Sequence, residues 1–157
     1  MGFLDFVHSI LNWTITFSVP QYLLHRLQRV QNAAARLTVK ASKSDHITPI
    51  LHSLHWLPAA ARIQYKVSSL CYSSQSDSGP EYLSRVMRIF APSRQLRSFS
   101  DNPIICVPSV KTKTIGQRSF SYAGSVIWNK RPYDIRTSQS KISFKQALKT
   151  HLFSTHY

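Results

Sequence analysis

Prolines divide this sequence into short segments. Pro20, Pro58 and Pro80 each precede a run with helical spacing of apolar side chains, and Pro92 and Pro132 each follow one. Proline lacks a backbone N–H and clashes with the preceding turn, so it is tolerated in the first turn of a helix and ends a helix that reaches it. The spacing of the prolines therefore predicts several separate helices joined by short connections.

The clearest predicted helix covers Gln21 to Lys40. At 100° per residue its apolar side chains share one arc, which predicts that they face the core: Leu23, Leu24, Leu27, Val30, Ala34 and Leu37. Its cations share a narrow neighbouring arc that contains no acid: Arg26, Arg29, Arg36 and Lys40. Surface helices usually interleave both signs of charge, so a phosphate-facing stripe is one interpretation and a solvated face beside the core is the other.

Further helices follow from the same spacing. Thr48 can cap a short helix with Pro49 at its first position. Pro58 and Pro80 introduce the next two, whose predicted core faces are Ile63, Val67, Leu70 and Cys71, and then Leu83, Val86, Met87 and Phe90. Helical spacing returns at Phe120 to Trp128 and again around Phe144, Ala147, Leu148 and Leu152. In the last helix Lys141, Lys145 and Lys149 recur every four residues.

The segment from Ser93 to Gly116 differs from the rest. Arg94 and Arg97 lie among Ser and Gln, and two β-branched runs follow at 104–107 and 110–115, the second carrying Lys111 and Lys113 on one face. These runs predict two strands of a small ribbon. The predicted fold class is mostly α, a small helical domain with a short two-stranded β ribbon at about residues 104–115.

The charge balance limits the function classes. Lys and Arg total 20 against 6 Asp and Glu, a net charge of +14, and such a charge favours a polyanionic partner. Metal-dependent polymerases and nucleases need clustered carboxylates, yet no acid lies next to another in this sequence. We therefore expect a chain that is not an enzyme, uses no cofactor and binds no small-molecule substrate.

Other candidate sites are weak. His46, His52 and His55 lie close together, but a structural zinc site usually includes thiolates, so ordinary histidines are favoured over a metal site. Cys71 and Cys106 are expected to be ordinary buried thiols in a reducing compartment, and no nucleophile or phosphate-loop motif is present. Residues 1–20 are apolar, but their early charge is Asp5, which disfavours a signal peptide or a membrane span.

Several blocks read in order resemble a known family. They are Tyr22–Leu37 (YLLHRLQRVQNAAARL), His46–Pro58 (HITPILHSLHWLP), Gly79–Leu83, Pro92–Ser98, Phe120–Asn129, Asp134–Arg136 and Ser143–Phe153 (SFKQALKTHLF). Together they are similar to the C-terminal region downstream of the reverse transcriptase domain in LINE-type, non-LTR, jockey-like retrotransposon polyproteins. The family's catalytic Tyr-x-Asp-Asp motif is absent here, and Arg131 stands where the family usually has an apolar residue.

The resemblance implies a thumb-like or post-thumb helical segment over residues 21–157, preceded by an apolar segment, 1–20, that does not resemble the family. We expect a non-catalytic remnant that binds RNA or DNA backbones with little sequence preference, in the nucleus or cytoplasm. The expected contacts are Arg26, Arg29, Arg36, Lys40, Arg94, Arg97, Lys111, Lys113, Lys141, Lys145 and Lys149. An alternative is an inert or partly folded fragment that touches anionic membranes through its apolar start, although a membrane partner is disfavoured.

Overall fold

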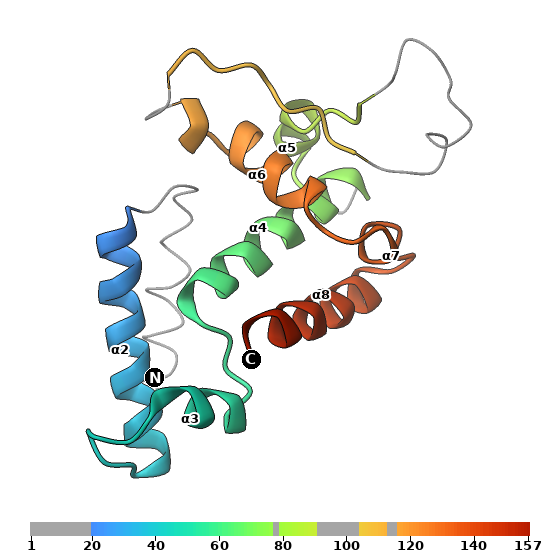
Figure 1. Cartoon of the computed structure of the whole chain (residues 1–157). Coiled ribbons are helices and arrows are strands. Elements are labelled where there is room, and N and C mark those ends of the chain that lie inside the picture. Colours follow the sequence, from blue (N-terminus) through green and yellow to red (C-terminus); the bar gives the residue numbers. More distant parts are fainter. Residues whose placement is uncertain (1–19, 77–78, 91–103, 113–115) are drawn as a thin grey trace.

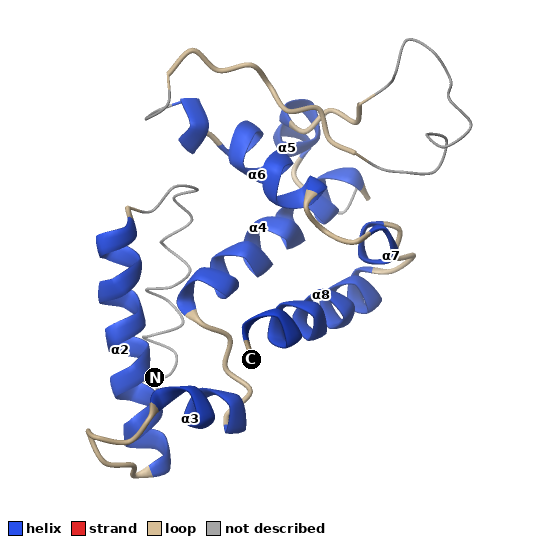
Figure 2. Ribbon diagram, viewed as in Figure 1, coloured by secondary structure: helices blue, strands red, loops and turns tan. Residues whose placement is uncertain are grey.

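The computed structural model describes residues 20–76, 79–90, 104–112 and 116–157. The elements in these ranges are α2 (Gln21–Val39), α3 (Ile47–Ser53), α4 (Ala59–Gln75), α5 (Glu81–Val86), the 3-10 turn η1 (Gly116–Arg118), α6 (Phe120–Asn129), α7 (Tyr133–Arg136) and α8 (Lys141–His156). Figure 2 shows helices and loops but no strand in this part of the chain. The prediction of a mostly α fold is confirmed.

Helix α4 is the centre of the arrangement. It packs against α2, α5, α6 and α8, and Figure 1 shows α2 and α8 on either side of it. Its two most closely packed neighbours are α6 and α8. Gly124 of α6 permits a close approach, because a Cβ there would lie 2.9 Å from Met87 Cε and 3.3 Å from Cys71 Sγ. A chain of short helices is thus organised around one central helix.

The core is aromatic where α4, α6 and α8 meet. Tyr72 stacks on Phe144 with ring centroids 4.4 Å apart, and Trp128 lies 5.8 Å from the same Phe144 ring. Leu148 and Leu152 extend this core along α8. The Tyr72 hydroxyl donates to the Ser138 carbonyl at 2.9 Å, so its polar end is satisfied.

Helix α2 docks through two glutamines. Gln31 is buried, and its Nε2 donates to the Leu57 carbonyl at 2.8 Å. The Oε1 of Gln28 accepts from the Ala59 N–H at 2.8 Å, which caps the first turn of α4. Both glutamines thus bond backbone groups of the segment 57–59. The buried residues of α2 are Gln31, Ala34 and Ala35, so the packed face is rotated by about 60° from the centre of the predicted apolar arc.

Because of this rotation, the prediction that Val30 and Leu37 face the core is wrong. Val30 and Leu37 are 52% and 73% exposed, whereas Gln31 and Ala35 are buried.

In α5 the predicted core face is likewise only half right. Leu83 and Met87 are buried, but Val86 and Phe90 are exposed. Phe90 lies four residues beyond Val86, the last residue of α5, so the helical spacing no longer applies to it.

The predicted β ribbon is wrong over the described part of 104–115. Residues 104–112 contain no strand, and Ile105 forms only an isolated antiparallel bridge with Ile89. On its other side the backbone of Ile105 bonds the side chain of Asn129, with both distances 2.9 Å. The Asn129 side chain satisfies both backbone groups of Ile105, while backbone groups of Arg88 and Phe90 bond its neighbours Cys106 and Ile104. No second strand is therefore needed, and Pro108 could not extend one.

Helices α2 and α3 end in Schellman motifs whose left-handed residues are not glycine. Lys40 has φ 54°, and the N–H of the next residue, Ala41, bonds the Arg36 carbonyl at 2.9 Å. His55 has φ 53°, and the Trp56 N–H bonds the Leu51 carbonyl at 2.9 Å. This position usually carries glycine, so both helix ends hold their side chains at a conformational cost.

The predicted cap at Thr48 is wrong, since α3 begins at Ile47, two residues earlier than predicted, and His46 occupies the cap position. Pro49 then falls in the third position of the helix. The N–H groups of the first turn have no partner within the helix, so proline is tolerated there as well. Ser119 and Ser140 supply side-chain caps to α6 and α8.

Candidate nucleic-acid interface

The lysines of α8 form the most regular group of exposed cations. Lys141, Lys145 and Lys149 are all exposed, and their spacing puts them about 6 Å apart along the helix axis. Helix α8 contains no Asp or Glu. Three positive charges thus follow one another along a helix without a carboxylate to neutralise them.

The four cations predicted to form a stripe on α2 have different surroundings. Arg26 and Arg29 are exposed in the middle of the helix. Arg36 is half-buried, and its Nη2 donates to the Asp45 carbonyl at 3.0 Å. Lys40 lies past the last turn, in the left-handed conformation that closes the helix. The stripe is therefore reduced to Arg26 and Arg29, beside the exposed side chains of Val30 and Leu37.

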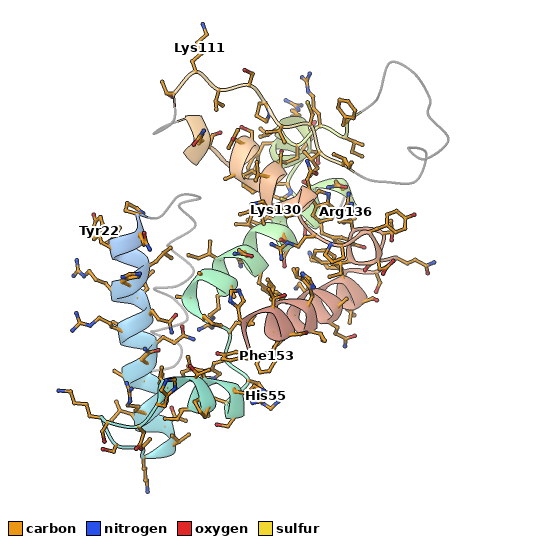
Figure 3. The ribbon with its side chains drawn as sticks, viewed as in Figure 1. Tyr22, His55, Lys111, Lys130, Arg136 and Phe153 are labelled. Carbon is orange, nitrogen blue, oxygen red and sulfur yellow. The ribbon has the colours of Figure 1, made fainter. Side chains whose placement is uncertain are left out.

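The remaining predicted contacts lie in the segment from Ser93 to Gly116. Lys111 is exposed in the loop 104–112, and Figure 3 shows it projecting from the edge of the molecule. Arg94, Arg97 and Lys113 lie outside the described residues. Of the predicted contacts that the structure describes, Arg26 and Arg29 are exposed on α2, and Lys141, Lys145 and Lys149 are exposed on α8. These two helices lie on either side of α4 (Figure 1).

Few of these charges are neutralised within the chain. Among the residues that the structure describes, one ion pair forms, between Arg85 Nη2 and Glu81 Oε1 at 2.7 Å, and both side chains are exposed. The other described acids, Asp45 and Asp134, are exposed on different segments. With only three described acids, all exposed and on different segments, carboxylates do little to offset the positive surface.

Two buried arginines have a different role that the sequence analysis missed. Arg131 is 8% exposed; its Nε donates to the Ile127 carbonyl at 3.2 Å and its Nη2 to Gln64 Oε1 at 2.9 Å. Arg136 is 9% exposed, and its Nε donates to the Arg131 carbonyl at 3.0 Å. Burial lowers the pKa of both guanidinium groups. For Arg136 the nearby Tyr133 raises the pKa, but by less than burial lowers it.

These arginines satisfy carbonyls where α6 ends, which a cation does favourably at a helix C-terminus. The buried guanidinium group of Arg131 is thus accommodated by polar partners, the Ile127 carbonyl and Gln64 Oε1. Burial, and secondly the charge of Arg131, lower the pKa of His151 on α8. The signal available in the sequence was the position of Arg131 directly after a predicted helix.

The histidines and cysteines do not form a metal centre in the described ranges. No group of three or more His, Cys, Asp or Glu side chains converges there. His52 and His55 instead contact Phe153, with ring centroids at 5.1 and 5.7 Å. Cys71 is buried, and burial raises the pKa of its thiol to about 12, whereas Cys106 is exposed.

Helices that could cross a membrane are not found among the described residues. Comparison of the chain with protein-family models, with curated proteins and with solved structures gives no match in any of the three.

Proposed function

We propose that this chain binds the phosphate backbone of RNA or DNA without catalysis. The observation that carries the proposal is the exposed row of Lys141, Lys145 and Lys149 on a helix with no acid. Phosphates neutralised by such cations release counterions, which favours binding whatever the base sequence. Arg26 and Arg29 supply a second, smaller contact surface on α2.

The resemblance of the sequence blocks supports the same proposal. In a LINE-type polyprotein the corresponding thumb-like or post-thumb region would help to hold template, primer or target strands after the polymerase domain. We propose that this chain keeps that holding role as a remnant without the polymerase. The described carboxylates support the absence of catalysis, because Asp45, Glu81 and Asp134 lie on three different segments.

Charge-matched variants test the proposal. The triple variant K141Q/K145Q/K149Q and the double variant R26Q/R29Q remove the two surfaces, while K43Q/K66Q/K130Q removes three exposed lysines elsewhere. We expect fluorescence anisotropy at physiological salt to show at least tenfold weaker binding of a labelled 20-base-pair duplex for the α8 variant, and a smaller loss for the α2 variant. Unrelated duplexes should give the same ranking, since phosphate contacts carry no sequence information.

The control variant separates this proposal from attraction by net charge alone. If K43Q/K66Q/K130Q weakens binding as much as K141Q/K145Q/K149Q, no surface of the chain is specialised for phosphates. If the unchanged chain binds only at low salt, the chain is an inert basic fragment.

A further inference from the structure

The lysine row of α8 leads directly to a group of aromatic rings. The four-residue spacing of Lys141, Lys145 and Lys149 continues at Phe153 and Tyr157. Residues four apart lie on neighbouring turns of a helix, so cations and rings follow one line that winds slowly around α8. The three lysines and the two aromatic residues therefore form one continuous line.

Side chains from α3 and its C-terminal end complete the aromatic group. The rings of His55 and Phe153 lie 5.7 Å apart at 16° to one another, so they are stacked. His52 contacts Phe153 and Tyr157 at 5.1 and 5.6 Å. Figure 3 shows His55 and Phe153 near one another, one from the end of α3 and one from α8. We call His52, His55, Phe153 and Tyr157 the aromatic platform.

The platform is held in place by backbone contacts. The Tyr157 hydroxyl donates to the Trp56 carbonyl at 2.7 Å, which ties the end of α8 to the chain after α3. His55 sits in the left-handed position of the Schellman motif, where glycine would be favoured. Its imidazole is nevertheless exposed. His55 thus carries an exposed ring at a position where its φ is strained. Such strain at an exposed residue points to a use for the side chain.

We propose that the aromatic platform stacks an unpaired base of a single-stranded nucleic acid whose phosphates contact Lys145 and Lys149. This inference rests on the proposed backbone binding and adds the class of nucleic acid. A row of cations that follows the backbone, next to rings that stack bases, is how proteins hold single strands without reading their sequence. Bases in a duplex are stacked on one another and offer no free face to His55.

The test compares a labelled 12-nucleotide oligouridylate with a 12-base-pair duplex, using the full chain. H55G removes the imidazole at a position that suits glycine, and F153L keeps an apolar side chain but removes the ring. Y82L removes an exposed tyrosine on α5 as a matched control. Thermal melting followed by circular dichroism shows whether each variant is folded.

We expect H55G and F153L to bind the oligouridylate about tenfold more weakly, which is the effect of losing one stacked base. Their affinity for the duplex should stay unchanged, and Y82L should bind both nucleic acids as the parent does. H55G should melt no lower than the parent, so that its loss of binding cannot come from unfolding. K145Q/K149Q should weaken binding of both nucleic acids.

Other outcomes overturn the inference in distinguishable ways. If folded H55G and F153L bind the oligouridylate as well as the parent, the platform only packs α3 against α8, while the proposed backbone binding stands. If H55G and F153L weaken both nucleic acids equally, the platform does not select single strands. If the parent binds neither at physiological salt, the proposed function and the platform fail together.

Discussion

The side chain of Asn129 bonds both backbone groups of Ile105. Its Oδ1 accepts from the Ile105 N–H and its Nδ2 donates to the Ile105 carbonyl, each at 2.9 Å. The amide thus takes the place of a neighbouring strand for one residue. Ile105 is itself 1% exposed and packs in the core next to Met87, so the bond fixes the chain after residue 103 against α6.

Replacing Asn129 by Ala should therefore lower the free energy of unfolding by about 2 kcal/mol, because two part-buried backbone groups lose their partners. Urea unfolding followed by circular dichroism measures the change. Gln146, which is exposed on α8, is the control, and Q146A should change stability by less than about 0.5 kcal/mol. Equal effects of the two substitutions would contradict this account of Ile105.

Gln31 should matter more for stability than Gln21, the exposed glutamine at the start of α2. Q31A leaves the Leu57 carbonyl without its partner, so we expect a loss of about 2 kcal/mol in the free energy of unfolding. Q21A, in the same helix but exposed, should be nearly neutral. A stable Q31A protein would show that α2 docks through its apolar side chains instead.

Lys40 offers a stabilising substitution. K40G places glycine in the left-handed position that ends α2, and we expect the free energy of unfolding to rise by about 0.5 to 1 kcal/mol. The same change inside a helix, K145G, should lower it by about 1 kcal/mol. Thermal melting compares the two variants, and a lower melting temperature for K40G would mean that its side chain compensates the cost.

The two cysteines should differ in reactivity. Cys71 is fully buried, and its pKa of about 12 leaves it as a thiol at pH 8, so iodoacetamide should not modify it in the folded chain. Cys106 is exposed and should be modified. Mass spectrometry after brief alkylation, with and without urea, gives the measurement. Modification of both thiols before denaturation would show that the core around Gly124 opens readily.

Salt dependence measures how many phosphates are contacted. A domain of this size that contacts about 4 to 8 phosphates should give a slope of log affinity against log salt of about −4 to −7 on duplex DNA. In K141Q/K145Q/K149Q the slope should shrink by about 2 to 3. A parent slope near −1 would contradict backbone binding.

The sequence predicted the positions of the longer helices because prolines and apolar spacing act locally. Helix α2 begins directly after Pro20, and α4 begins directly after Pro58, as expected. The packed face of α2 was mispredicted because it depends on Gln28 and Gln31 meeting backbone groups about thirty residues away. Such partners are not visible in the periodicity of one helix.

The same reason limits the prediction of the candidate site. The cations of α8 were predicted from their spacing, and the structure places all three on the surface. Arg36 was predicted to lie in the stripe but bonds the Asp45 carbonyl beyond the end of α2. The contact between His55 and Phe153 joins residues nearly a hundred positions apart, so only the folded chain could bring them together.

The docking of α2 has a consequence for amide hydrogen exchange. Opening α2 breaks the two glutamine contacts at Leu57 and Ala59 but leaves the rings of Tyr72, Trp128 and Phe144 packed. Local openings need less free energy than global unfolding when they expose little of the core. The amides of α2 should therefore exchange first, through local opening. The amides in the middle of α4 should exchange only when the whole domain unfolds.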